Sequence, residues 1–319
     1  MLLKFLHNKY KDHPKFPVVM HWVKTFTFPG LEKVPLYDVI KMFRSEIKND
    51  AINIRAAFIS YFFILAMFPS ITFFFTLIPY LPIPNFDKIL MDFLQEILPE
   101  AVYIVLQSTI ADIVQIQRGG LLSLNFFLGM LFATNGVNSI MVAFDKVNHT
   151  FKKRKWYEKR IVAIQIVALV STQLILAIFL FVIGENSINW ILSYLNIRSD
   201  FTVYLFKSVK LFLIAFCLFN TIATMYYLAP AVKKKYRYFS AGATFATCMA
   251  LILSYVFSAY INYFHNFNRL YGSLGLIIVV MLWVYFNSIN ILFGFELNNS
   301  IQVSKSKKDE RKKMKLPNL

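Results

Sequence analysis

The sequence predicts an all-α membrane protein, a polytopic bundle of six transmembrane helices with an extracytoplasmic amphipathic helical hairpin. Two observations predict this fold class. Six apolar segments are each long enough to cross a hydrocarbon core about 30 Å thick, and the basic residues gather in alternate connections between them. The segments lie near residues 54–78, 121–144, 161–185, 203–228, 239–263 and 273–298.

The basic residues predict the orientation of the bundle. Of 34 Lys and Arg residues, 27 lie before the first span, between the second and third, between the fourth and fifth, or after the sixth. Short loops rich in Lys and Arg stay in the cytoplasm, so we expect a multi-pass protein of the bacterial inner membrane with both termini cytoplasmic. The expected parts are a basic segment over 1–52, the membrane domain over 53–299 and a basic tail over 300–319.

The net charge of +17 has two possible explanations, nucleic-acid binding or membrane orientation. The basic runs 152–155 and 233–235 directly adjoin spans, where insertion orientation and contact with anionic headgroups account for them. We therefore expect membrane lipids as partners and no nucleic acid.

One long connection, residues 79–120, is expected outside the membrane. Its apolar residues recur at helical spacing on both sides of Pro99, which predicts two amphipathic helices. We interpret residues 86–117 as a helical hairpin in the outer interface; a solvent-facing cap on the bundle is an equal alternative.

Polar residues within the spans are informative, because lipid offers them no hydrogen-bond partner. Several recur at helical spacing and define candidate positions of a substrate path: Asn135, Asn138, Asn220, Tyr227, Thr247, Ser254, Ser258, Asn287 and Asn290. They line a polar cavity between spans two, four, five and six, or they only join the helices to one another. The sequence leaves both interpretations open.

Other residues near the spans suggest specific roles. Pro69 should kink the first span, and Lys207 and Lys210 are candidates to snorkel or to bind an anionic headgroup. Glu296 lies on the face of its span opposite the asparagine stripe, and Asp145 ends the second span. We expect each carboxylate to pair with a basic residue of a neighbouring loop.

The sequence does not favour catalysis. The five histidines are dispersed and both cysteines, Cys217 and Cys248, lie in predicted spans, so no metal-ligand spacing is present. Neither a Gly-x-Ser-x-Gly elbow nor a Walker-type loop occurs. We therefore expect no enzyme activity, no metal and no cofactor.

From about Phe43 to Asn299 the chain resembles the YihY/BrkB family of bacterial inner-membrane proteins, formerly labelled ribonucleases BN. The resemblance depends on motifs in order along the chain: Ala56-Ala57-x-x-x-Tyr61, Leu65-x-x-Phe68-Pro69, Leu98-Pro99, Tyr226-Tyr227-x-x-Pro230, Ser240-Ala241-Gly242-Ala243, Tyr271-Gly272-Ser273-Leu274-Gly275, Trp283-x-Tyr285 and Leu292-x-Gly294-x-Glu296-Leu297-Asn298. It implies six spans with cytoplasmic termini. For activity it implies only proposals of transport, including envelope lipid traffic and solute or ion export.

The function we expect is transport or lipid handling that is not driven by ATP, with a lipid or a small solute as substrate. The alternative is a structural or interaction scaffold without transport activity. The sequence specifies neither the substrate, nor a coupling ion, nor an oligomeric state.

Overall fold

The computed structural model describes residues 34–49, 51–77, 80, 107, 118–145, 154–195, 200–231, 236–263 and 273–315, and every regular element among them is helical. The helices are α3 (Leu36–Asn49), α4 (Ile52–Leu77), α7 (Gly119–Phe144), α8 (Trp156–Leu195), α9 (Asp200–Leu228), α10 (Ala241–Tyr263) and α12 (Ser273–Lys315). The all-α prediction is confirmed. The hairpin expected over 86–117 lies outside the described residues, apart from Gln107.

Within the described residues, five stretches are long and apolar enough to cross a membrane: Ile52–Phe74, Gly119–Phe144, Leu211–Leu228, Ala241–Ala259 and Ile277–Glu310. They correspond to five of the six predicted spans. The remaining predicted span, the third along the chain near 161–185, falls inside the long helix α8. Long helices follow from these apolar sequences because a helix satisfies its own backbone hydrogen bonds where no water is available.

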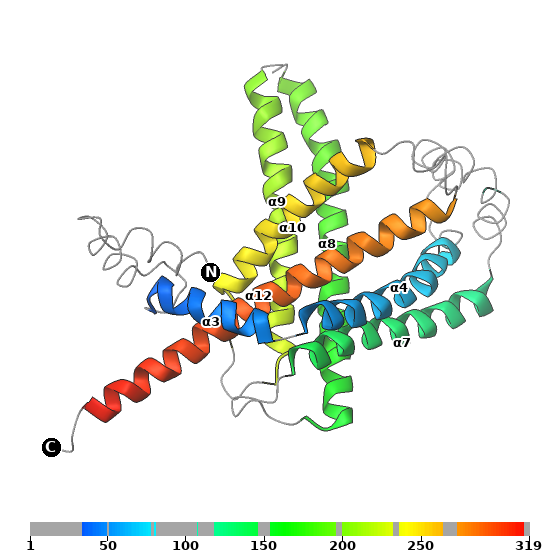
Figure 1. The fold of residues 1–319 in the computed structure, drawn as a ribbon. Helices are drawn as coiled ribbons and strands as arrows, with labels where there is room; N and C mark the ends of the chain where they lie inside the picture. Colours follow the sequence, from blue (N-terminus) through cyan, green and yellow to red (C-terminus); the bar gives the residue numbers. More distant parts are fainter. Residues whose placement is uncertain are drawn as a thin grey trace.

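The helices meet at one end of the bundle and separate toward the other (Figure 1). Here the packed end means the end where α4, α8 and α10 begin and where α7 and α9 finish. The outer halves are the opposite halves of the same helices. In Figure 1, α4 lies beside α7, α8 lies beside α9, and α12 runs between α10 and α4.

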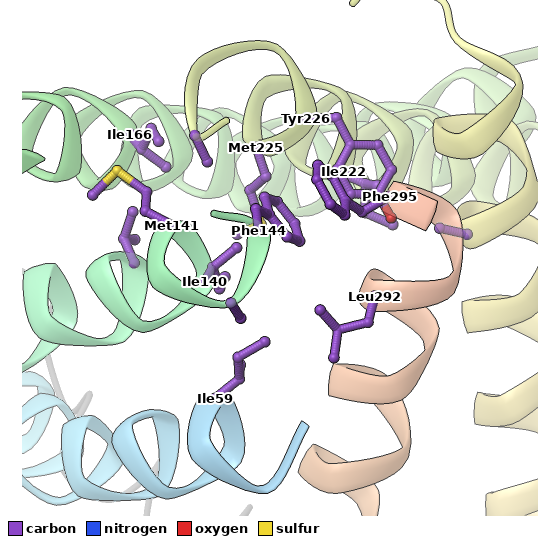
Figure 2. Close-up of a cluster of buried hydrophobic side chains, with 14 of the residues drawn as sticks. Ile59, Ile140, Met141, Phe144, Ile166, Ile222, Met225, Tyr226, Leu292 and Phe295 are labelled. Carbon is purple, nitrogen blue, oxygen red and sulfur yellow. The ribbon is translucent and has the colours of Figure 1, made fainter. Parts of the chain in front are cut away.

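The buried core lies at the packed end. Phe144 of α7 stacks on Phe295 of α12 with ring centroids 4.1 Å apart, and Tyr226 of α9 lies beside them (Figure 2). Ile59, Ile140 and Leu292 are fully buried in the same cluster. In the outer halves, by contrast, large apolar side chains such as Phe74, Phe127 and Phe212 are exposed, as expected for surfaces that face lipid tails.

Helices also occupy parts of both expected basic terminal segments. Helix α3 occupies part of the basic N-terminal segment, and α12 continues as one helix to Lys315 through the expected tail. Val34 and Val39 pack against Ile301 of α12, so α3 and the extension of α12 form one unit. Pro69 lies inside α4, which is helical on both sides of it.

Candidate functional site

Helices α10 and α12 approach closely at the packed end because two glycines face each other. A Cβ atom added to Gly242 would lie 2.1 Å from the Gly294 carbonyl oxygen, and one added to Gly294 would lie 2.3 Å from the Tyr226 hydroxyl. Only glycine fits at either position. The crossing brings backbone against backbone, the arrangement that small residues permit between membrane helices.

Two asparagines one turn on either side of Gly294 connect α12 to α10. Asn290 donates from Nδ2 to the Ala246 carbonyl at 2.8 Å. Asn298 accepts from the Gly242 N–H at 2.8 Å and donates to the Ser240 hydroxyl at 3.0 Å. Ser240 in turn accepts from the Ala243 N–H at 3.2 Å, as an N-cap of α10 does. This part of the predicted stripe therefore joins helices.

The opposite face of α12 carries a buried ion pair. Glu296 is fully buried and accepts from Arg55 of α4 at 3.1 Å. Arg55 also donates to the Ala143 carbonyl at the end of α7, so one guanidinium joins three helices. Glu296 is paired as expected, although its partner belongs to a helix and not to a loop. Asp145 pairs with Lys159 of α8 at 2.6 Å.

The basic run 152–155 contributes one partly buried side chain to the contacts between helices. Arg154 donates to the carbonyls of Ala229, Leu228 and Pro230 at 2.8, 3.2 and 3.4 Å. Leu228 is the last residue of α9 and Ala229 and Pro230 follow it, so the guanidinium binds carbonyls at the end of the helix, where no further turn supplies N–H donors. Burial lowers the pKa of Arg154, while Asp145 and Glu158 act in the opposite direction. Arg154 is thus a C-terminal cap of α9 as well as part of a basic loop.

The candidates on α7 and α9 have local partners. Asn135 accepts from Arg160 at 2.7 Å, and Asn138 is half-buried on the same helix. Asn220 accepts from the Tyr238 hydroxyl at 3.0 Å, and the ring of Tyr227 lies edge-on to Tyr238.

Tyr238 is the centre of a polar cluster that the sequence did not indicate. Its hydroxyl also lies 3.2 Å from the Thr224 hydroxyl, and Gln173 of α8 contacts Thr224 and Thr221 of α9 at 3.5 and 3.4 Å. The helical spacing of Asn220, Thr224 and Tyr227 could have suggested the α9 side. Gln173, which follows Ser171 and Thr172 inside a predicted span, could have suggested the α8 side.

The remaining candidates lie on α10, α12 and the outer part of α9. Thr247 is buried and donates to the Ala243 carbonyl of its own helix at 2.8 Å. Ser254 and Ser258 are exposed, and Asn287 is partly exposed and donates to the Trp283 carbonyl. Lys207 and Lys210 belong to α9, and the structure describes only the backbone at these two positions. Among the described residues, no group of three or more His, Cys, Asp and Glu could hold a metal ion.

The long apolar helices and their uncovered apolar outer surfaces define a multi-pass membrane protein. The sequence model of the Virulence factor BrkB family matches residues 43–317, and the chain belongs to that family. The resemblance inferred from the sequence motifs is confirmed.

Similar proteins are found in several bacteria. The chain is 28% identical over 256 residues to YfkH of Bacillus subtilis, named a ribonuclease-like protein, covering 80% of this chain and 92% of the relative. It is 29% identical over 114 residues to a UPF0761 membrane protein of Idiomarina loihiensis, covering 34% of this chain and 40% of the relative. A UPF0761 membrane protein of Xanthomonas oryzae is 28% identical over 83 residues, which is 26% of this chain and 20% of the relative. No solved structure matches the chain.

Proposed function

We propose that the protein moves or handles membrane lipid without ATP, along a polar stripe on the outer halves of α10 and α12. The supporting observation is a change of burial along one face of α10. Thr247, Ser254 and Ser258 lie within about 40° of one another around the helix axis. Thr247 is buried at the packed end, whereas Ser254 and Ser258 are exposed. A polar face thus runs from the interior onto a surface that lipid would cover.

Exposed hydroxyls and amides on such a surface need a polar partner, because hydrocarbon supplies none. A lipid headgroup that crosses along the stripe would supply one, and its acyl chains would meet neighbouring apolar side chains. Tyr255 on α10 and Met281 and Leu282 on α12 are exposed in this region. The packed end, joined by hydrogen bonds and an ion pair, would stay closed while the outer halves carry the lipid.

The test is translocation of fluorescently labelled phospholipid in proteoliposomes. The intact protein is compared with a Ser254→Leu/Ser258→Leu/Asn287→Leu variant, reconstituted at equal density. Val256→Leu is the matched control, because Val256 is exposed on the opposite face of α10 and stays apolar. We expect the triple variant to lose at least about tenfold in rate, since a polar group passing an apolar face loses its partners, and the control to keep the full rate.

Two results would contradict this proposal. Equal rates for the triple variant and the intact protein would remove the path, and an intact protein that moves no phospholipid would remove lipid as the substrate.

We further propose that the packed end faces the cytoplasm of a bacterial cell, in the inner membrane. The support is charge: the basic connections 146–160 and 233–237 adjoin the packed end. Fusions truncated at residues 150 and 236 should give fluorescent GFP, and fusions at 198 and 269 should give active alkaline phosphatase. Phosphatase activity at 150 would contradict the orientation, and an inactive fusion at 198 would contradict six spans.

A scaffold function is the second candidate, and the packing of α3 against α12 favours it. Helix α3 docks on the extension of α12, whose final turns are basic and exposed at Lys307 and Lys308. If the protein acts by displaying this unit, deleting residues 304–319 should abolish rescue of a gene-deletion strain, while the triple stripe variant should rescue it. The reverse pattern would favour transport.

A further inference from the structure

The buried ion pair at the packed end is accompanied by buried polar atoms from three nearby residues. Tyr236 Oη, Asn299 Nδ2 and Ser300 Oγ are buried, and none has a hydrogen-bond partner within the described part of the chain. Asn299 and Ser300 are at most 1% exposed and Tyr236 is 7% exposed. A buried polar group left without a hydrogen bond destabilises the folded state, so three of them require an explanation.

The three atoms belong to the surroundings of Glu296. Asn299 and Ser300 follow Glu296 by three and four residues, so all three side chains lie on one face of α12. Tyr236 comes from the connection between α9 and α10, and its ring contacts that of Phe295. Burial raises the pKa of Tyr236, and the Glu296 carboxylate raises it further. The phenol therefore keeps its proton and can donate it in a hydrogen bond.

The chemistry of the site selects its ligand. Arg55 and Glu296 already cancel each other's charge, so an added ion of either sign would meet a like charge within the site. Phenol, hydroxyl and amide groups suit a neutral molecule that both donates and accepts. Water has this property, and buried waters in proteins make about three hydrogen bonds to groups that otherwise lack partners.

We propose that ordered water binds inside the packed end and connects Tyr236, Asn299 and Ser300 to the Arg55–Glu296 ion pair. The site is distinct from the stripe on the outer halves of α10 and α12. Arg55 remains 16% exposed, which gives the water a route of exchange with the surface.

Hydroxyl-radical footprinting of the full-length protein in detergent tests the proposal, because radicals generated from bound water label the side chains beside it. Tyr226 is the matched control: it is also a buried tyrosine, but its hydroxyl is bonded to the Ile291 carbonyl at 2.7 Å. We expect Tyr236 to be labelled several-fold faster than Tyr226. Replacing Ser300→Val, which fills the site, should remove most of this difference. Equal labelling of the two tyrosines, or labelling of Tyr236 that Ser300→Val leaves unchanged, would overturn the proposal.

A double-mutant cycle gives a second, independent readout. Tyr236→Phe and Ser300→Ala are each expected to lower the melting temperature by a few degrees, and the double variant by less than the sum, because both groups bind the same water. Ser288→Ala is the control, since the Ser288 hydroxyl is buried but bonds within its own helix to Val284. Unchanged or raised melting temperatures with additive effects would mean that the Tyr236 and Ser300 hydroxyls bind no common water, and would refute the proposal.

Discussion

The packed end and the outer halves of the same helices are stabilised by different means. At the packed end, backbones approach closely at Gly242 and Gly294, asparagines connect α12 to α10, and Arg55 joins α4, α7 and α12. In the outer halves, large side chains such as Phe74, Phe212 and Tyr255 are exposed. One chain thus combines a tightly packed end with exposed apolar surfaces that lipid would cover. The contrast predicts that equally small changes will have very different effects in the two regions.

The largest effect is expected from Gly242→Ala. The new methyl group would overlap the Gly294 carbonyl and the Asn298 side chain, which lies 2.6 Å from the ideal Cβ position. Helices α10 and α12 would have to separate and lose their hydrogen bonds. We expect a loss of about 3 kcal/mol or more in the free energy of unfolding, measured by thermal unfolding in detergent.

Gly129→Ala provides the matched control in the outer half of α7. The closest atom to its added Cβ would be the Ser70 hydroxyl oxygen at 4.0 Å, which is ordinary contact. Stability should change by no more than about 0.5 kcal/mol. Similar losses for the two variants would mean that the two regions do not differ in packing.

The next effect is expected from breaking the buried ion pair. Arg55→Met leaves the Glu296 carboxylate buried without the Arg55 guanidinium, which costs about 3 kcal/mol. The double variant Arg55→Met/Glu296→Leu should be more stable than Arg55→Met alone, because it removes the stranded charge as well. A double variant that is less stable than the single one would show that Glu296 is held by other groups.

The ion pair between Asp145 and Lys159 offers a comparison within the same region. Its side chains are 31% and 25% exposed, so solvent screens their attraction. Asp145→Asn should cost about 0–1 kcal/mol.

A smaller effect than that of the buried pair is expected from Arg154→Met. The variant removes the three donated hydrogen bonds at the end of α9 but keeps the aliphatic stem. Hydrogen bonds from charged donors contribute about 1.5–3 kcal/mol, and water can replace some of them here because Arg154 is only partly buried. We expect a loss of about 2 kcal/mol, with faster hydrogen exchange in the last turn of α9. Unchanged exchange there would contradict the capping role.

Sequence reasoning predicted individual spans well because each depends on local composition. The faces of α12 are an instructive case: helical spacing separates Glu296 from Asn290 and Asn298, and the structure places them against α4 and α10 respectively. The identity of those partners was not predictable, because pairing between helices depends on tertiary packing. Arg55 lies at the start of the first predicted span and Arg154 in a basic run beside the third, and nothing local distinguishes a lysine or arginine that faces lipid or solvent from one that pairs inside the protein or caps a helix. Tyr238 is not predictable as a polar centre either, because its contacts with Asn220 and Thr224 depend on how the connection after α9 packs against that helix.

The smallest effect on stability is expected in the proposed path itself. Ser254→Val and Ser258→Val replace exposed hydroxyls on the outer half of α10, where the chain has no tight packing to disturb. The free energy of unfolding should change by no more than about 0.5 kcal/mol, in contrast to Gly242→Ala on the same helix. A large loss of stability would show that these serines bind another part of the protein, and would favour helix association over a substrate path. Unchanged stability together with slower lipid movement would show that the two halves of α10 differ in function as well as in packing. In that case the lost hydroxyls would affect the bound substrate and not the fold.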